Sequence, residues 1–395
     1  LAWGVEPAPA PSAPPRKPAP VQADRPPEAD PYAGWFALDD DLPRYVLGGR
    51  LLREHPVHPR AAAVRDALAK LRRRPQPLAL LEQDPETGYS TWVALRGGSL
   101  VGVDVRGVVA VWDLESGRET SRTPVGGGID GAVVLGPDAL LLSVQGPRAG
   151  LYAWSRGREL QSLIGRKVND TSLVADATHF AAGTFDGKLH VFDRATHARV
   201  LRLEGLRYAS EALALSPDGR ALAAGAHSPG SRSKTELTEA ELGVWDLAAR
   251  SQTARVRIAT QPRELRYSAD SGALYVGSTL GTLECRDART LALRFEFVVE
   301  SADEFLRPRA HVGSMRGLEV LPDGRLLSLS RAPGKDIEPE VHQLHVWDPR
   351  DGRFLGAVAG LVHPPVSLAV DPERELIAVG TSTGHVVLLP LPRAE

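Results

Sequence analysis

The sequence contains one cysteine, one methionine and few aromatic residues, which make up 6% of its 395 residues. A single cysteine, Cys285, excludes an internal disulfide and any Cys-x-x-Cys motif. Its position in an apolar, strand-like run predicts a buried and unreactive thiol. A lone cysteine also fits a reducing compartment, so we expect a cytoplasmic protein. No apolar run approaches the roughly 18 residues needed to span a membrane, so we expect no membrane partner.

The sequence also lacks an excess of charge of either sign. It has 47 basic and 49 acidic residues and a formal net charge of −2. Attraction to the phosphate backbone depends on clustered positive charge, so we expect no nucleic acid partner. No Gly-rich phosphate loop leads into a helix, and no Gly-x-Ser-x-Gly motif occurs. We therefore expect neither catalysis nor a cofactor.

What the sequence does contain is a repeat that ends in an aromatic-Asp pair behind a short β-branched run. The clearest copies are Trp112-Asp113, Phe192-Asp193, Trp245-Asp246 and Trp347-Asp348. Weaker copies are centred on Trp154, Arg286 and Leu388, which gives seven units about 40 to 60 residues apart. A unit of this size cannot bury its apolar face alone, so the units must stack on one another.

Each unit has the pattern of four short strands joined by polar turns. In the fourth unit, 211–215 and 220–226 flank the turn Ser216-Pro217-Asp218-Gly219, and 242–246 and 252–259 follow. Proline at the second turn position presets φ, and Asp-Gly suits a tight reversal. Four such strands per unit predict an all-β fold, a seven-bladed β-propeller of four-stranded blades covering residues 76–395.

These features resemble the WD-repeat family over residues 78–392. The Gly-His pair that opens units in that family is missing. Only Thr184, Ser278 and Thr381 occupy the position of the family's second-strand hydroxyl, so its buried hydrogen-bond network is incomplete here. The resemblance implies a non-catalytic scaffold that holds partner proteins, and we expect a monomeric propeller within a larger complex.

Ring closure requires a strand from outside the seventh unit. The third strand of that unit, 385–391, is followed only by four residues, and an unpaired sheet edge would expose its N–H and C=O groups. The suitable run is Leu78–Glu82, which we expect to pair beside 385–391 as the outer strand of blade seven.

An N-terminal extension precedes the propeller. Ten of the 26 residues from 6 to 31 are proline, so 1–31 is predicted to be a disordered tether. The next segment, 32–75, begins with an aromatic patch at 32–38 that could dock a partner or, as we expect, fold back onto the propeller rim. The pattern predicts one short helix over 59–74 that packs on the propeller side. The alternative is a helix that binds a partner or RNA.

Three insertions lengthen loops on one face of blades four to six. They are the second-to-third-strand loop 228–241, the interblade loop 300–312 and the second-to-third-strand loop 331–341. Loops on a rigid scaffold commonly bind partners, so we expect a protein partner on this face. Phe305 is the expected anchor, because an aromatic among charges suits an interface centre. The candidate partner-binding residues are Arg232, Lys234, Glu236, Asp303, Phe305, Arg307, Arg309, Lys335, Asp336 and Glu338.

Two other functions remain open. Carboxylates near the starts of inner strands, Asp130, Asp170, Glu211 and Glu264, could converge at the tunnel mouth and hold calcium or another hard cation in a metal-dependent hydrolase. Asp130 and Asp170 align with Ser210 rather than with Glu211, so the carboxylates do not occupy equivalent positions on the inner strands. Polar residues lining a water-filled tunnel account for these carboxylates adequately, and we expect no metal site. The protein could also be the sensor module of a multi-protein complex.

Overall fold

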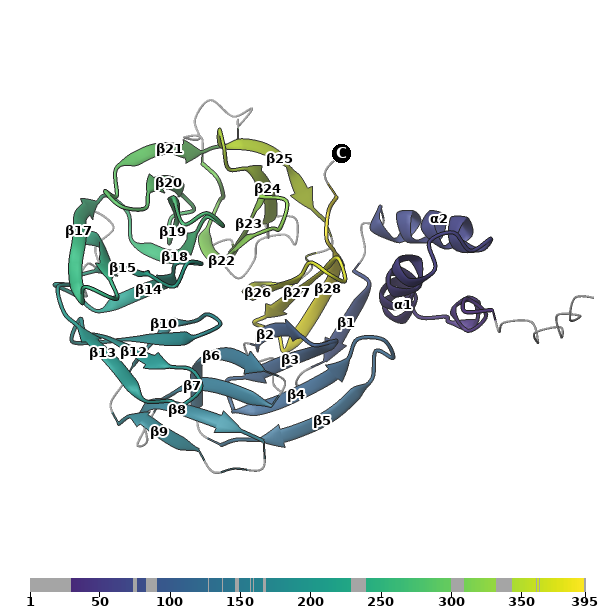
Figure 1. Ribbon diagram of the computed structural model, residues 1–395, viewed down its shortest axis with the longest axis horizontal. Helices are drawn as coiled ribbons and strands as arrows, with labels where there is room; N and C mark the ends of the chain where they lie inside the picture. The colour runs from purple at the N-terminus through teal and green to yellow at the C-terminus, as the bar shows by residue number, and fades with distance from the viewer. Residues whose placement is uncertain are drawn as a thin grey trace, which may run out of the picture.

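The computed structural model describes residues 30–73, 77–82, 91–126, 128–136, 138–145, 149–156, 158, 160–165, 168–228, 239–299, 309–331, 343–359, 361 and 363–393. Seven four-stranded antiparallel sheets are arranged as blades around a central axis (Figure 1). The predicted all-β, seven-bladed β-propeller is therefore confirmed. The predicted tether, 1–31, lies outside the described residues except for Asp30 and Pro31.

In blades one to six, each sheet consists of four strands that are consecutive in the chain. Blades one to three contain β2 (Thr91–Arg96), β3 (Ser99–Asp104), β4 (Val108–Asp113), β5 (Glu119–Pro124), β6 (Gly128–Gly136), β7 (Ala139–Gln145), β8 (Gly150–Ser155), β9 (Gln161–Ile164), β10 (Val168–Ala175), β11 (His179–Thr184), β12 (Leu189–Asp193) and β13 (Arg199–Leu203). Blades four to six contain β14 (Ser210–Leu215), β15 (Ala221–His227), β16 (Ala240–Asp246), β17 (Ser251–Ile258), β18 (Pro262–Tyr267), β19 (Ala273–Ser278), β20 (Leu283–Asp287), β21 (Leu293–Phe297), β22 (Ser314–Val320), β23 (Leu326–Arg331), β24 (Gln343–Asp348) and β25 (Arg353–Val358).

Blade seven takes its outer strand from the N-terminal side of the ring. Its strands are β26 (Pro365–Asp371), β27 (Leu376–Thr381), β28 (His385–Pro390) and β1 (Ala79–Glu82). β1 runs antiparallel to β28, with Leu80 opposite Val387, and the Leu78 N–H donates to the Leu388 carbonyl at 2.8 Å. The predicted closure by residues 78–82 is confirmed.

The core lies between neighbouring blades, because each sheet is covered on both faces. Between blades four and five, Leu242 and Val244 pack in one cluster with Leu265 and Leu274. The repeated aromatic residue belongs to these layers, as Trp245 and Trp347 show at 1% and 0% exposure. Burial of both sheet faces explains why most residues of the middle strands are apolar.

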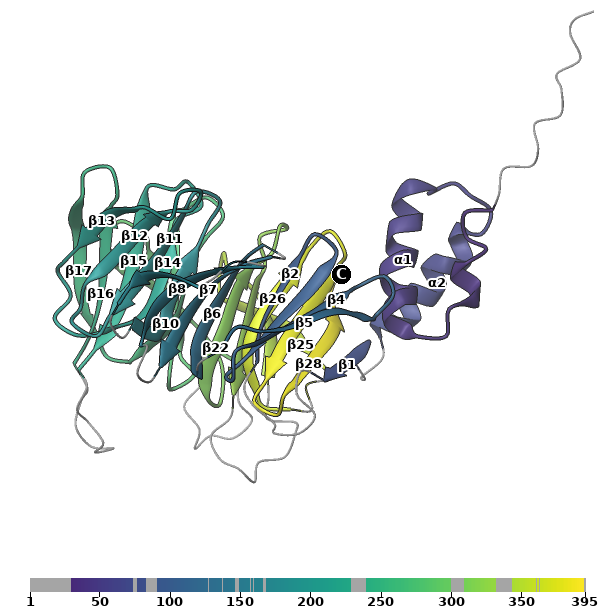
Figure 2. The same ribbon diagram turned by 90° about the horizontal axis from the view of Figure 1, so that it is seen from below.

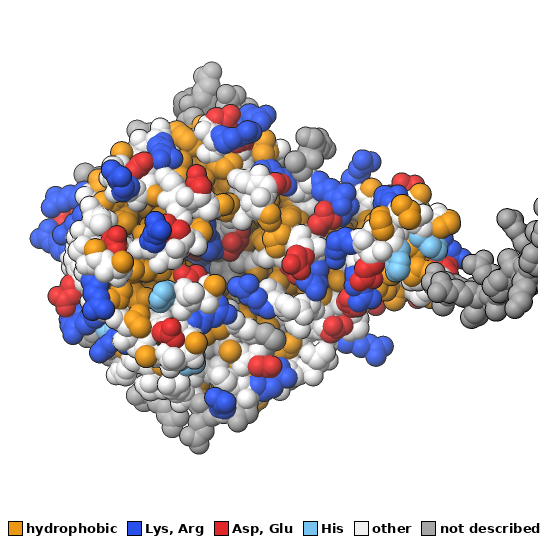
Figure 3. All heavy atoms as spheres, viewed as in Figure 1, with side chains coloured by type: hydrophobic (Ala, Val, Ile, Leu, Met, Phe, Trp, Pro, Cys, Tyr) orange, Lys and Arg blue, Asp and Glu red, His pale blue; other side chains and the backbone are white. Residues whose placement is uncertain are grey.

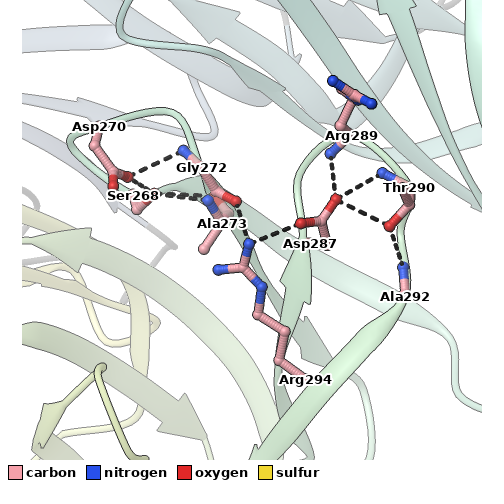
Figure 4. Close-up of polar contacts among 9 residues, drawn as sticks. All are labelled: Ser268, Asp270, Gly272, Ala273, Asp287, Arg289, Thr290, Ala292 and Arg294. Atoms are coloured by element: carbon pink, nitrogen blue, oxygen red, sulfur yellow. Dashed lines mark hydrogen bonds and ion pairs between the residues drawn. The ribbon is translucent and has the colours of Figure 1, made fainter.

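The repeated aspartate caps the turn between the third and fourth strands. In blade five, Asp287 Oδ1 accepts hydrogen bonds from the N–H groups of Arg289 and Thr290 at 3.1 and 2.9 Å, and Arg294 Nη2 donates to Asp287 Oδ2 at 2.8 Å (Figure 4). The same Nη2 also donates to the Gly272 carbonyl at 2.9 Å, which links this turn to the first hairpin of the blade. These contacts hold the pKa of the Asp287 carboxyl well below its usual range. The aspartate therefore recurs because it satisfies N–H groups in the turn.

The same turn places the residue four positions after the aspartate in the left-handed region. That residue has φ between 56° and 79° in five blades, and its identities are Gly117, His197, Arg250, Leu291 and Gly352. Only glycine adopts this conformation without a steric cost, so three blades accept some strain here.

Two helices and a short 3-10 turn lie beside blades one and seven (Figure 2). They are η1 (Trp35–Ala37), α1 (Asp41–Glu54) and α2 (Ala61–Arg72). α2 is the helix predicted within 59–74, and its Val64 and Leu68 are buried as expected. α1 is an addition that the sequence analysis did not predict. Among the described residues, the structure has no helix long and apolar enough to cross a membrane.

The aromatic patch at 32–38 folds back onto α1 rather than directly onto the propeller rim. The Tyr32 hydroxyl is within hydrogen-bonding distance of the Leu51 carbonyl, at 2.9 Å, and Trp35 Nε1 donates to the Arg44 carbonyl at 2.7 Å. A Cβ on Gly48 would lie only 2.6 Å from Trp35 Nε1. The expected rim contact is instead made by the helices, because the aromatic side chains fill the space left by a glycine of α1.

The helices contact the ring through charged and aromatic side chains. Tyr45 is 1% exposed, its hydroxyl donates to the Glu375 carbonyl at 3.1 Å, and Arg72 Nε donates to that hydroxyl at 3.0 Å. Arg72 also forms an ion pair with the Glu375 carboxylate. A second ion pair joins Arg50 Nη1 to Glu115 Oε1 at 2.7 Å. One apolar cluster is shared by the helices, β1 and blades one and seven, so the helices cover the point of closure.

Candidate partner-binding face

Loops between the second and third strands and loops between blades lie on the same face of the ring. Of the ten candidate partner-binding residues, only Arg309 is among the described residues. The others lie outside them: Arg232, Lys234, Glu236, Asp303, Phe305, Arg307, Lys335, Asp336 and Glu338.

Arg309 connects the interblade segment to a turn of blade five. The Val299 N–H donates to the Arg309 carbonyl at 3.0 Å, which brings the two ends of the interblade loop together. Arg309 Nη1 donates to the carbonyl of Leu280 at 3.3 Å. Leu280 belongs to the turn between β19 and β20, so one arginine spans both kinds of loop on this face.

Three exposed aliphatic side chains lie on the segments that Arg309 connects. Leu280 is 54% exposed, Val298 is 40% exposed and Val312 is 57% exposed. We call these three residues and Arg309 the blade five–six patch. Large aliphatic side chains exposed together around a charge are typical of protein interaction surfaces.

The base of this patch is tightly packed. The His311 N–H donates to the Gly281 carbonyl at 3.0 Å, so the blade-five turn lies directly against the segment entering blade six. Gly281 has φ of 81°, and a Cβ there would lie 2.3 Å from the His311 carbonyl oxygen. This close approach requires glycine and fixes Leu280 and Val312 on one rigid base.

Beneath the patch, blade six contains a buried polar network. The His311 and His345 rings are stacked with centroids 4.3 Å apart. His311 Nε2 lies 2.6 Å from Ser328 Oγ, which also accepts a hydrogen bond from Trp347 Nε1 at 2.7 Å. Burial holds the pKa of His311 well below its ordinary value and lowers that of His345 to about 4. Ser328 thus provides a second-strand hydroxyl that the sequence analysis missed, since its partners are distant in the chain.

The three hydroxyls that the sequence analysis did identify bind their own turns. Thr184 Oγ1 donates to the Lys188 carbonyl at 3.1 Å and Thr381 Oγ1 to the His385 carbonyl at 2.8 Å. Ser278 Oγ accepts from the Thr282 N–H at 3.1 Å. They stabilise the turns between second and third strands, on the same face as the patch.

Blade four contributes a groove of about 620 Å³ on this face. The Tyr208 hydroxyl donates to Glu239 Oε2 at 2.5 Å, and Arg207 Nη1 lies 3.3 Å from the same oxygen. Arg255 forms an ion pair with the buried Glu241 carboxylate. The hydrogen bond from Tyr208 holds the pKa of Glu239 below its usual range, so this carboxylate stays charged. Charged walls distinguish this groove from the aliphatic blade five–six patch.

The carboxylates considered for a tunnel-mouth metal are interleaved with basic groups. Glu211 Oε2 lies 3.8 Å from Arg263 Nη1, and Glu211 Oε1 lies 3.6 Å from His227 Nε2. Burial raises the pKa of Glu264, while nearby arginines lower it. The side chain of Asp170 is not among those described. Within the described residues, no three His, Cys, Asp or Glu side chains are grouped so that they could hold a metal ion.

Cys285 is buried in β20, with 2% of its surface exposed. Burial raises the pKa of its thiol. The thiol is therefore protonated at neutral pH, which is the state expected for a packing residue rather than a nucleophile.

Comparison with known proteins supports the fold class. No protein-family model matches the sequence. The curated proteins likewise include no match. Among solved structures, the chain is similar to the computationally designed Ika8 protein, with a TM-score of 0.54 and 15% sequence identity over 80% of this chain and 99% of that chain. At this identity the likeness shows the fold alone, which is that of a β-propeller.

Proposed function

We propose that the protein is a non-catalytic, WD-repeat-like scaffold that holds a partner protein on the blade five–six patch. The observation that carries this proposal is the exposure of Leu280, Val298 and Val312 around Arg309. Burying such side chains against a partner removes apolar surface from water, which is the main favourable term in most protein associations. The packed base beneath them means that little conformational entropy is lost on binding.

Arg309 supports a specific kind of partner surface. Arg309 is exposed and its Nη1 reaches the carbonyl of the exposed Leu280, so a carboxylate on the partner could form a charge-assisted hydrogen bond beside an apolar contact. The segments 300–308 and 332–342, which lie outside the described residues, carry the remaining candidate residues of blades five and six. In the proposal they add contacts around the patch, and the protein acts as a cytoplasmic, monomeric propeller within a larger complex. A role as the sensor module of such a complex stays a prediction.

The test is affinity purification from the cells that make the protein, with a double variant of the patch. Leu280→Glu with Val312→Glu places two charges in the proposed contact, where each would be buried without a counter-ion. The matched control is Val200→Glu with Leu293→Glu, because these side chains are 42% and 47% exposed on the outer strands β13 and β21.

The proposal predicts that a specific partner is retained by the wild type and by the outer-strand variant and is lost from the patch variant. Thermal unfolding of all three proteins checks that the ring is intact. Equal retention by the two double variants would contradict the proposal, as would loss of the partner from the outer-strand variant alone.

A further inference from the structure

The ring encloses a channel of about 820 Å³ along its axis. Residues of the inner strands of blades one, two, three, five, six and seven line it, and these strands surround the centre of the ring in Figure 1. Acidic and basic side chains both border the centre of the face seen in Figure 3. The channel is large enough for a small organic molecule, because ligand pockets usually have volumes of about 300–1,000 Å³.

Positive charge exceeds negative charge in this channel. The carboxyl groups in its wall are those of Asp130, Glu264 and Glu319. The guanidinium groups are more numerous, and they come from Arg96, Arg263, Arg266, Arg316 and Arg331. The protein as a whole carries a net charge of −2, so the basic excess is a property of the channel and not of the composition.

Four of the five arginines lie on blades five and six, close to the carboxyl groups of Glu264 and Glu319. A third carboxyl group, that of Glu211, lies 3.8 Å from Arg263 Nη1. Arg266 Nε donates to the Leu318 carbonyl at 2.9 Å, and the same guanidinium pairs with Glu319. Three arginines, at positions 263, 266 and 316, act on Glu264. Burial raises the pKa of both glutamates, and both residues stay partly exposed to the channel, Glu319 with 28% of its side-chain surface. In such an environment an anion is attracted more strongly than in bulk water.

The opposite wall of the channel is largely aliphatic. Its partly exposed apolar residues, from blades one, two, three and seven, include Trp92, Ala94, Val133, Leu173, Val174, Val366, Leu368 and Val370. A ligand that spans the channel would therefore meet guanidinium groups on one side and apolar side chains on the other. This combination fits a molecule with an anionic head and an apolar body.

We propose that the central channel binds a small organic anion, with its phosphate or carboxylate group on the arginines of blades five and six and its apolar part against blades one to three and seven. Arginine suits both head groups, because its fixed fork of donors matches two oxygens at once. This site is separate from the blade five–six patch, so the two proposals can fail independently.

Isothermal titration calorimetry tests the proposal with defined probes. The test ligands are n-octyl phosphate and octanoate. Inorganic phosphate is the control without an apolar body, and octyl glucoside is the control without a charge. We expect one molecule of an octyl anion per chain, weaker binding of inorganic phosphate and no binding of octyl glucoside. The tighter of the two octyl anions identifies the head group.

Variants of matched charge test the location of the bound anion. Arg263→Gln with Arg331→Gln removes two channel arginines, and we expect at least a tenfold loss of affinity. Arg202→Gln with Arg257→Gln removes two exposed arginines of the outer strands β13 and β17 and should bind as the wild type does. The patch variant Leu280→Glu with Val312→Glu should also retain the octyl anion.

Several results would overturn the proposal. They are the absence of binding by both octyl anions at millimolar concentration, equal binding of octyl glucoside, and unchanged affinity in the channel variant. Inorganic phosphate binding as tightly as n-octyl phosphate would overturn the role of the aliphatic wall. Circular dichroism of the channel variant confirms that a loss of affinity does not come from unfolding.

Discussion

The Tyr45 hydroxyl donates a hydrogen bond to the Glu375 carbonyl, 330 residues away in the chain, and thereby joins α1 to blade seven. The same hydroxyl accepts a hydrogen bond from Arg72 of α2. Burial raises the pKa of Tyr45, with Arg72 opposing that rise, so the hydroxyl remains protonated at neutral pH and can donate. The two helices are thus held at the point where the ring closes.

Replacing this hydroxyl tests the contact between helices and ring. We expect Tyr45→Phe to lower the free energy of unfolding by about 1–2 kcal/mol, because it removes one donor and one acceptor from buried partners. Chemical denaturation measures this change. Tyr267→Phe is the matched control, since among the described residues the buried Tyr267 hydroxyl has no hydrogen-bond partner. It should leave stability unchanged or raise it, and equal losses in both variants would contradict the assignment.

The stacked histidines of blade six predict a dependence of stability on pH. Burial lowers the pKa of His345 to about 4, and that of His311 lies well below 6.5. Between about pH 6.5 and 4 the unfolded chain therefore binds protons that the folded protein does not. The free energy of unfolding should fall as the pH is lowered through this window, by up to about 1.4 kcal/mol per pH unit for each histidine.

Urea denaturation of His345→Phe at several pH values checks this dependence. Phenylalanine keeps a ring against Phe354 and Trp347 but cannot bind a proton. We expect a shallower decline in stability between pH 6.5 and 4 than in the wild type. His55→Gln changes an exposed histidine and should leave the decline unaltered. A wild-type stability that is constant over this window would refute the prediction.

The turn after the repeated aspartate predicts two substitutions of opposite effect. Arg250 is exposed with φ of 56°, and Gly117 has φ of 67° with space for a Cβ. Arg250→Gly relieves the left-handed strain and should be neutral or stabilise by up to about 1 kcal/mol, whereas Gly117→Ala should destabilise by about 1 kcal/mol. Thermal unfolding measures both. If both substitutions stabilised or both destabilised the protein, the left-handed backbone conformation would not be what determines the change in stability.

The repeat made the ring predictable, because its information is local. Most blades carry their own turn residues, and five of the seven carry their own capping aspartate, as Asp193 and Asp287 illustrate. Closure by residues 78–82 followed from counting strands, since one blade lacked its outer strand. The repeat can still be recognised where another residue replaces the aromatic one, as Arg286 does in blade five.

The first helix was not predictable in the same way. Pro43 and the pair Gly48-Gly49 lower the helix propensity of this segment. In the structure Pro43 lies in the first turn, where proline is tolerated, and Gly48 makes room for Trp35. The helix therefore depends on a tertiary contact, which a local pattern cannot reveal.

The candidate face was only partly predictable for a similar reason. The lengths of the inserted loops predicted which face of the ring binds a partner. Of the candidate residues on that face, Arg309 is among the described ones. Leu280, Val298 and Val312 carried no sequence signal, because whether an aliphatic residue at a strand end is exposed depends on which neighbouring loop covers it. The channel charge was likewise hidden, since Arg263 and Arg316 are brought together only by the adjacency of β18 and β22.

The central claim is that β1 closes the ring by pairing with β28, and a pair of engineered cysteines tests it most directly. In a Cys285→Ser background, Leu80→Cys and Val387→Cys are direct cross-strand partners and should form an intramolecular disulfide under mild oxidation. Leu80→Cys with Leu389→Cys is two residues out of register, about 7–8 Å apart, and should form it poorly. Mass spectrometry of the non-reduced digest should show residues 80 and 387 linked within one chain. Free thiols at both positions, or only links between chains, would contradict closure of the ring by this strand.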